Sequence, residues 1–270
     1  MLFRSVPELL ERAGNLRWIA CPQAGPRAGY YHEALIASEV VLTNTREIYN
    51  DHISAHIMSF LLAFARGLHV YIPQQLEANW RQGYDTIYLP EATAVIVGVG
   101  GIGGETARLC AEFGMRVIGV DPRLDQAPPG VAELVRPGGL ASALPQGDFV
   151  IATVPETPET QGMFAATQFK AMKNTAFFIN IGRGATVELD DLVDALRAGD
   201  IAGAGLDVFQ TEPLPATHPL WSISGVLITP HVAGDGPYLQ ERRTDLFIDN
   251  CVRFNEGRQL RNVVDKANWF

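Results

Sequence analysis

The stretch Gly98-Val99-Gly100-Gly101-Ile102-Gly103 has the spacing G-x-G-x-x-G and follows an apolar run, residues 93–97, that is rich in β-branched side chains. A helical pattern continues from it to residue 110, and a second apolar run, residues 115–120, ends on Asp121. This order of strand, glycine turn, helix, strand and acidic residue is the dinucleotide-binding fingerprint. The glycines permit a tight turn and a close approach to a pyrophosphate, whose charge the helix N-terminus favours. The sequence therefore predicts a nucleotide-binding βαβ unit.

The composition is that of a folded protein, with 270 residues of which 47% are hydrophobic. A net charge of −9 disfavours a nucleic-acid or anionic-membrane surface, because such surfaces need clustered lysine and arginine. No apolar run approaches the ~20 residues that span a bilayer. The three cysteines fit no metal spacing and indicate reduced thiols. We therefore expect a cytoplasmic protein with no metal site, no nucleic-acid partner and no membrane partner.

The alternation of predicted strands and helices after residue 92 has βαβ spacing, which implies a parallel sheet covered on both faces. The expected strands cover residues 93–98, 115–120, 148–153, 176–181, 202–206 and 226–229, and the expected helices 102–113, 166–171, 188–198 and 236–256. Upstream, we expect helices at 7–15 and 52–68 and strands at 16–21 and 40–43. The second of these helices is apolar on most sides, so it should be buried or lie at an interface. These patterns predict an α/β fold with a doubly wound Rossmann sheet.

Polar residues directly follow several predicted strands, where open parallel sheets bind their ligands. Arg183 has a forked, permanently charged guanidinium that suits a carboxylate. His231 also follows a strand, and Glu212 could hydrogen-bond and orient its imidazole. Asp207 could contact a cofactor or cap a turn. The other five histidines have no comparable setting in the sequence: His32, His52, His56, His69 and His218.

Asp121 predicts a preference for NAD(H) over NADP(H), because a carboxylate at the end of the second strand accepts from the ribose 2′-hydroxyl and repels a 2′-phosphate. Arg123 lies two residues further on. A nearby arginine can accommodate the 2′-phosphate, so the two side chains favour different cofactors.

The chain resembles the D-isomer-specific 2-hydroxyacid dehydrogenase family. The matching segments follow the family order and cover nearly the whole chain: 98–103, 148–160, 172–184, 203–213, 230–234 and 262–265. The resemblance implies a Rossmann domain, residues 47–235, and a small flavodoxin-like substrate-binding lobe, residues 1–46 plus 236–270. It implies an NAD(H)-dependent transfer of hydride between the nicotinamide and a small 2-hydroxy or 2-oxo acid.

By this resemblance, Arg183 binds and polarises the 2-oxo acid, His231 donates and accepts the proton, and Glu212 is its partner. Ala24 and Gly25 would contribute to the substrate site with Arg183. The implied cofactor-binding residues are Gly98, Gly100, Gly101, Ile102, Gly103, Asp121, Arg123, Thr153, Val154, Pro155, Thr160, Ile181, Gly182, Arg183, Asp207, His231 and Gly234. Family members also pair as homodimers through the segment that corresponds here to residues 52–68 and the arm at 70–88. A helix enclosed within its own monomer is the alternative reading of residues 52–68.

Two departures from the family pattern favour a different function. The substrate-binding lobe is undersized, as expected for a truncated gene model, a fragment, or a lobe whose sheet edge a partner covers. The substrate loop contains Pro26, which has no N–H to offer a carboxylate, and Arg27. Both departures favour a non-catalytic, NAD-binding dimeric regulator of the corepressor type, whereas the intact Arg183, Glu212 and His231 favour an enzyme. A formate-type dehydrogenase would carry glutamine as the histidine partner, so Glu212 argues against it.

Overall fold

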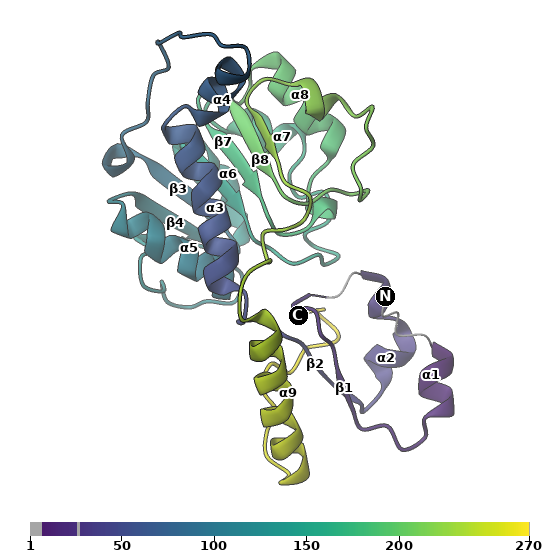
Figure 1. The fold of residues 1–270 in the computed structure, drawn as a ribbon. Helices are drawn as coiled ribbons and strands as arrows, with labels where there is room; N and C mark the ends of the chain where they lie inside the picture. Colours follow the sequence, from purple (N-terminus) through teal and green to yellow (C-terminus); the bar gives the residue numbers. More distant parts are fainter. Residues whose placement is uncertain (1–6, 26–27, 270) are drawn as a thin grey trace. The chain divides into compact units, whose positions relative to one another are not determined.

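The structure is a computed structural model that describes residues 7–25 and 28–269 (Figure 1). The chain divides into two compact units. The larger contains Asn50–Val154 and Thr160–Asp235, and the smaller contains the described parts of Met1–Tyr49, Pro155–Glu159 and Gly236–Phe270. Residues 47–49 and 155–159, which the sequence placed with the Rossmann domain, therefore group with the smaller unit. For residues 48 and 49 the cause is direct: Arg242 donates to the Ile48 carbonyl oxygen at 2.7 Å, and Arg243 to the Tyr49 hydroxyl at 2.8 Å.

The larger unit is built on a seven-stranded parallel sheet with the order β5-β4-β3-β6-β7-β8-β9. The central strand β3 pairs with β4 on one side and with β6 on the other, so the strand order reverses there, as in a Rossmann sheet. This confirms the predicted fold. The strands are β3 (Thr93–Val97), β4 (Arg116–Val120), β5 (Glu133–Val135), β6 (Phe149–Ala152), β7 (Phe177–Asn180), β8 (Gly203–Leu206) and β9 (Val226–Ile228).

Helices cover both faces of this sheet, as predicted. Along β3, Ala94 and Ile96 join the core beneath α3 and α5, whereas Val95 and Val97 join the core beneath α7 and α8. Figure 1 shows α3 beside α5 in front of the sheet. The helices of this unit are α3 (Asn50–Ala65), α4 (Leu68–Leu76), α5 (Gly101–Glu112), α6 (Leu140–Ala143), α7 (Ala166–Ala171) and α8 (Leu189–Ala198). Its short 3₁₀ helices are η2 (Leu89–Glu91), η3 (Pro137–Gly139), η4 (Leu144–Gln146), η5 (Gly184–Thr186) and η6 (Pro219–Ser222).

The smaller unit contains a two-stranded parallel sheet, β1 (Trp18–Ala20) and β2 (Val41–Thr43). This small sheet is in line with a shortened substrate-binding lobe. Buried Cys21, Leu35 and Leu42 form the centre of its core. Its helices are α1 (Pro7–Arg12), η1 (Ala28–Tyr30), α2 (Glu33–Ala37) and α9 (Leu239–Asn255).

The helix expected over residues 52–68 is wrong at its C-terminal end, because α3 stops at Ala65 and α4 starts at Leu68. Gly67 separates them with a left-handed φ of 73°, which glycine adopts without steric cost. Within the described residues, no single helix is long and apolar enough to cross a membrane. The one pair that passes such a test together, α3 with α4, is bent by 74°.

A second difference concerns α9, which begins at Leu239 rather than at residue 236, after Tyr238 with a φ of 65°. The strand β5 was missed altogether. Its two apolar residues, Leu134 and Val135, stand between the charged Glu133 and Arg136, so no apolar run marked it as a strand.

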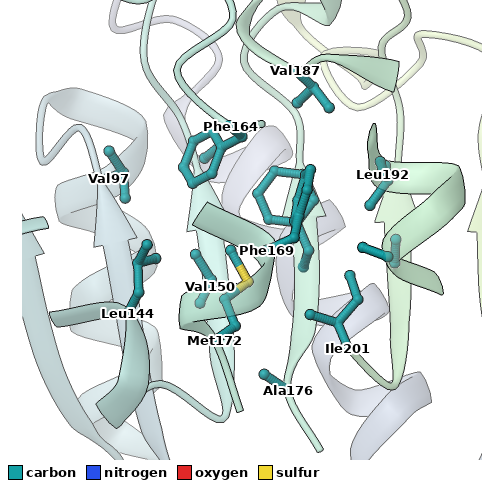
Figure 2. Close-up of a cluster of buried hydrophobic side chains, with 14 of the residues drawn as sticks. Val97, Leu144, Val150, Phe164, Phe169, Met172, Ala176, Val187, Leu192 and Ile201 are labelled. Atoms are coloured by element: carbon teal, nitrogen blue, oxygen red, sulfur yellow. The ribbon is translucent and has the colours of Figure 1, made fainter. Parts of the chain in front are cut away.

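The core beneath α7 and α8 is aromatic at its centre (Figure 2). Phe178 of β7 packs against Phe164 with ring centroids 4.9 Å apart, and against Phe169 of α7 edge to face at 5.4 Å. All three rings are fully buried. Figure 2 shows Phe164 and Phe169 directed into the space between helix and sheet.

We predict that Phe169→Ala lowers the free energy of unfolding by about 3–5 kcal/mol, because the truncated side chain leaves a cavity in a closely packed core. Urea denaturation followed by circular dichroism measures this loss. Lys170→Ala changes the exposed next residue of the same helix and should stay within about 0.5 kcal/mol of the wild type. A loss below about 1 kcal/mol for Phe169→Ala would show that the core collapses onto the vacated space.

Candidate active site

Six strands of the larger sheet end at one edge that carries candidate residues. Gly98 follows β3, Asp121 follows β4, Thr153 follows β6, Ile181 follows β7 and Asp207 follows β8, and His231 lies three residues after β9. Because all these strands run parallel, their carboxyl ends lie on the same side of the sheet. Ligands of open α/β sheets bind in the crevice at this edge, next to the strand where the order reverses.

The glycine turn after β3 requires glycine for steric reasons. Gly98 has a φ of 91°, and a side chain there would press on Val154. A side chain on Gly103 would overlap the Gly98 carbonyl group and approach the Thr153 hydroxyl. Helix α5 begins directly after Gly100, which has no side chain to cap its first amides. Those amides and the helix dipole suit a phosphate group, so the turn fits the pyrophosphate of a dinucleotide.

The acidic residue after β4 is bound to the protein's own backbone. Asp121 is 1% exposed. Its Oδ2 accepts from the Val99 amide at 2.9 Å, and its Oδ1 accepts from the Arg123 amide at 2.9 Å and from Arg123 Nε at 3.4 Å. The Arg123 side chain is 44% exposed, and its Nη2 lies 3.5 Å from the position that a Cβ on Gly100 would occupy. The buried carboxylate of Asp121 therefore stabilises the turn through its hydrogen bonds. The side chain of Arg123, beside it, remains accessible to solvent.

The loop after β7 positions Arg183. Asn180 is buried, accepts from the Gly182 amide at 3.0 Å and donates to the Arg183 carbonyl oxygen at 3.1 Å. Arg183 Nη1 donates to the Gly182 carbonyl oxygen at 2.7 Å. A side chain on Gly184 would overlap the backbone of Phe209, so this loop lies against the segment that leads to Glu212. Asn180 lies at the predicted strand end, but no sequence pattern showed that it buttresses the loop.

The structure brings Glu212 and His231 together. His231 Nδ1 lies 2.9 Å from Glu212 Oε2, and Glu212 Oε1 accepts from the Phe209 amide at 3.1 Å. The Glu212 side chain is 19% exposed, whereas that of His231 is 46% exposed. The carboxylate is thus held from both sides, and it orients an imidazole that remains accessible. An oriented, accessible imidazole can give and take a proton.

Asp207 anchors the loop that carries His231. Its Oδ1 accepts from the Thr229 hydroxyl at 2.6 Å and from the Val232 amide at 2.9 Å, and its Oδ2 accepts from the Ala233 amide at 2.9 Å. His231 itself has a left-handed φ of 56°, which is uncommon for a residue with a side chain. The sequence left two roles open for Asp207, contact with a cofactor or capping of a turn. In the structure, Asp207 caps the turn. His56 Nε2 lies 3.0 Å from Thr229 Oγ1, so His56 also lies at this edge, which no sequence pattern indicated.

The other candidate residues are divided between the two units. Thr153 donates to the carbonyl oxygen of Gly98, and Val154 contacts that glycine. Thr160 and Gly234 belong to the larger unit, whereas Pro155, Ala24 and Gly25 belong to the smaller. Pro26 and Arg27, and with them the missing amide, lie outside the described residues. In the described part of the chain, no group of three or more His, Cys, Asp or Glu side chains is placed to hold a metal ion.

Comparisons with known proteins agree on one family. Residues 58–233 match the sequence profile described as "D-isomer specific 2-hydroxyacid dehydrogenase, NAD binding domain". A glyoxylate reductase/hydroxypyruvate reductase of Mus musculus is 36% identical over 259 residues, which cover 90% of this chain and 75% of the mouse protein.

Solved structures give the same result. A D-isomer specific 2-hydroxyacid dehydrogenase from Xanthobacter autotrophicus Py2, in complex with NADPH, has a TM-score of 0.87 and 29% identity, and the match covers 96% of this chain and 80% of that one. An NADPH-dependent glyoxylate/hydroxypyruvate reductase from Sinorhizobium meliloti, in complex with NADP, has a TM-score of 0.86 and 29% identity, with 100% and 85% covered.

Proposed function

This chain belongs to the D-isomer specific 2-hydroxyacid dehydrogenase family, and we propose that it is a nicotinamide-dependent reductase of small 2-oxo acids such as glyoxylate and hydroxypyruvate. The observation that carries this proposal is the pair of His231 and Glu212, joined at 2.9 Å on the sheet edge that also holds the glycine turn and Arg183. A regulator that only bound the dinucleotide would need the turn but not an oriented acid–base group.

The reduction needs a hydride and a proton. The glycine turn would hold the pyrophosphate of the dinucleotide, and the reduced cofactor would supply the hydride for the carbonyl carbon of the 2-oxo acid. Arg183 pairs with the negatively charged substrate and polarises its carbonyl group through a charge that does not titrate. Protonated His231 gives its proton to the carbonyl oxygen as negative charge develops there, and Glu212 holds the ring through Nδ1. In the oxidation of a 2-hydroxy acid, the same imidazole accepts the proton.

We predict that His231→Gln lowers kcat by about 10²–10⁴-fold, because the variant lacks the positioned proton donor. Turnover is measured from NADH and NADPH absorbance with glyoxylate, hydroxypyruvate, pyruvate and bulkier 2-oxo acids. Binding of the reduced cofactor, followed by fluorescence titration, should be unchanged. His52→Gln, a histidine at the start of α3, should leave turnover within about twofold of the wild type.

A His231→Gln variant with near wild-type turnover would remove the proposed acid–base role. No turnover of any 2-oxo acid by a wild-type protein that binds the cofactor would favour the alternative function, a dimeric regulator of the corepressor type that senses the dinucleotide without reacting.

The choice of cofactor is a second part of the proposal. We keep NAD(H) as the preferred cofactor, because the Asp121 carboxylate places negative charge beside the turn. Arg123 opposes this preference, since its guanidinium lies over Gly100 and neutralises part of that charge. The two structural relatives named above hold NADP or NADPH, which adds weight to the arginine.

We therefore predict a higher kcat/KM with NADH than with NADPH. Arg123→Ala should lower kcat/KM for NADPH by about tenfold or more and change that for NADH by less than about threefold, because the guanidinium would pair with the 2′-phosphate, which NADH lacks. Steady-state kinetics with both cofactors measure this difference. Equal or better efficiency with NADPH in the wild type would show that Arg123 outweighs Asp121.

The third part of the proposal is a homodimer. The apolar side chains of α3 that suggested an interface, such as Ile57, Leu61 and Phe64, are enclosed within the larger unit. An exposed apolar stripe lies instead on α4 and the segment after it. Leu68, Ile72 and Leu76 (84% exposed) recur every four residues on α4, and the segment after it carries Trp80 (95% exposed) and Tyr88. Large exposed aromatic and aliphatic side chains that gather together are typical of interface cores.

We predict a dimer mass by light scattering at micromolar concentration, and a shift to the monomer for the double variant Ile72→Asp/Trp80→Ala. A buried charge and the loss of a large aromatic contact each weaken an apolar interface. Phe113→Ala, a change of an exposed ring outside the stripe, should leave the dimer intact. A wild-type monomer would refute the proposed interface and leave the stripe for a different partner.

A further inference from the structure

A hydrogen-bonded chain of three side chains runs behind the loop that carries His231. Thr229 Oγ1 lies 2.6 Å from Asp207 Oδ1 and 3.0 Å from His56 Nε2. A hydroxyl has one proton, and an ionised carboxylate only accepts, so Thr229 donates to Asp207. The Thr229 oxygen must then accept from His56. This order assigns the proton of the His56 imidazole to Nε2 without reference to any ligand.

The place of His56 is fixed from α3. Its ring stands edge to face on Phe60, one turn later in the same helix, with centroids 4.9 Å apart. Phe60 in turn lies so close to Gly205 of β8 that a Cβ there would come within 2.8 Å of the ring. The imidazole therefore reaches the carboxyl ends of β8 and β9 from a rigid helix. His56 Nε2 also lies 3.8 Å from Asp207 Oδ1, so the imidazole and the carboxylate lie on two sides of the Thr229 hydroxyl.

The far end of this chain is the backbone directly after His231. Asp207 accepts from the amides of Val232 and Ala233, which directly follow His231. His231 is held at a φ of 56°, a conformation that persists for such a residue only where the surroundings fix it. A carboxylate that can rotate holds two amides less firmly than one whose third bond fixes its plane. The third bond here comes from Thr229, and His56 fixes the direction of that hydroxyl.

We propose that His56 is a positioning residue for His231, which acts through Thr229 and Asp207 to hold the histidine loop in its strained conformation. The proposal rests on the acid–base role proposed for His231. It assigns a function to a side chain 173 residues away from Thr229 in sequence, on a helix that supplies no other candidate to the site. His56 touches neither substrate nor cofactor in this role.

The test compares two substitutions at one position. His56→Leu removes the donor and keeps an apolar side chain over Phe60, and His56→Gln keeps an N–H donor at Nε2. We expect His56→Leu to lower kcat by about 10- to 100-fold, the effect of a small misplacement of a catalytic group, with KM for the nicotinamide cofactor within about twofold. His56→Gln should recover most of the loss. Ser59→Ala removes an exposed hydroxyl of the same helix that bonds only to Ala55, and it should have no effect.

A purely structural role is separated by double variants. Thr229→Val breaks the same chain, so its effect on kcat should not add to that of His56→Leu. In the His231→Gln background, His56→Leu should have no further effect, because nothing remains to be positioned. Full kcat in His56→Leu, or additive losses in either double variant, would overturn the proposal.

A readout that needs no turnover separates this proposal from the proposed function. In ¹⁵N-histidine NMR spectra, His56 should be protonated at Nε2, and the signals of His231 should shift in His56→Leu but not in Ser59→Ala. If the wild type reduces no 2-oxo acid, the proposed function fails. The NMR spectrum still tests whether His56 positions His231. Unchanged His231 signals would overturn it, whether or not the protein is an enzyme.

Discussion

The buried carboxylate of Asp207 accepts three hydrogen bonds at the end of β8, and the geometry of the histidine edge depends on them. Burying a charge is costly unless donors replace the lost water, and here the donors are a hydroxyl and two amides. Because the amides lie directly after His231, the energy that solvates the charge also fixes the backbone of the histidine. Glu212 then orients the imidazole ring of a residue whose backbone is already fixed. Without Asp207, the amides of Val232 and Ala233 would lose the carboxylate that accepts from them.

The glycine turn uses the same device at the other end of the crevice. Asp121 is as buried as Asp207 and gives its oxygens to the amides of Val99 and Arg123. A carboxylate at the end of β4 thus closes the turn after β3, and a carboxylate at the end of β8 closes the turn after β9. In both cases the acidic residue shapes a loop of the neighbouring strand. The side chain presented beside it, Arg123 in one case and His231 in the other, is the one that remains accessible.

The fold was predictable from the sequence because its signals are local. The β-branched runs, the G-x-G-x-x-G turn and the alternation of elements each occupy a few adjacent residues, and they predicted six of the seven parallel strands. The strand β5 was missed because charged Glu133 and Arg136 leave only two adjacent apolar residues there. Gly67 interrupts the apolar pattern after α3 without leaving a gap in it, so the first helix was predicted to continue to residue 68, and α4 was not predicted as a helix.

The site was predictable only in part, because its connections are distant. Glu212 and His231 were predicted as partners from the residues themselves and from the family resemblance, and their contact is now seen. His56 was set aside, since an isolated histidine on an apolar helix gives no indication of a threonine 173 residues away. Asp207 was open between two roles, because a sequence does not reveal which amides surround a carboxylate.

The division of the chain between its two units also sets the order in which they can form during synthesis. All strands of the larger sheet lie between Thr93 and Ile228, so that sheet is complete before α9 has left the ribosome. The smaller unit is not, because its first half is made at the start and α9 at the end. Its Asn262 bonds back to Arg46 across 216 residues of chain. Domains that emerge first fold first, and contacts between distant segments close slowly. During translation, the strands β1 and β2 therefore remain without α9 until the whole nucleotide-binding sheet has been made.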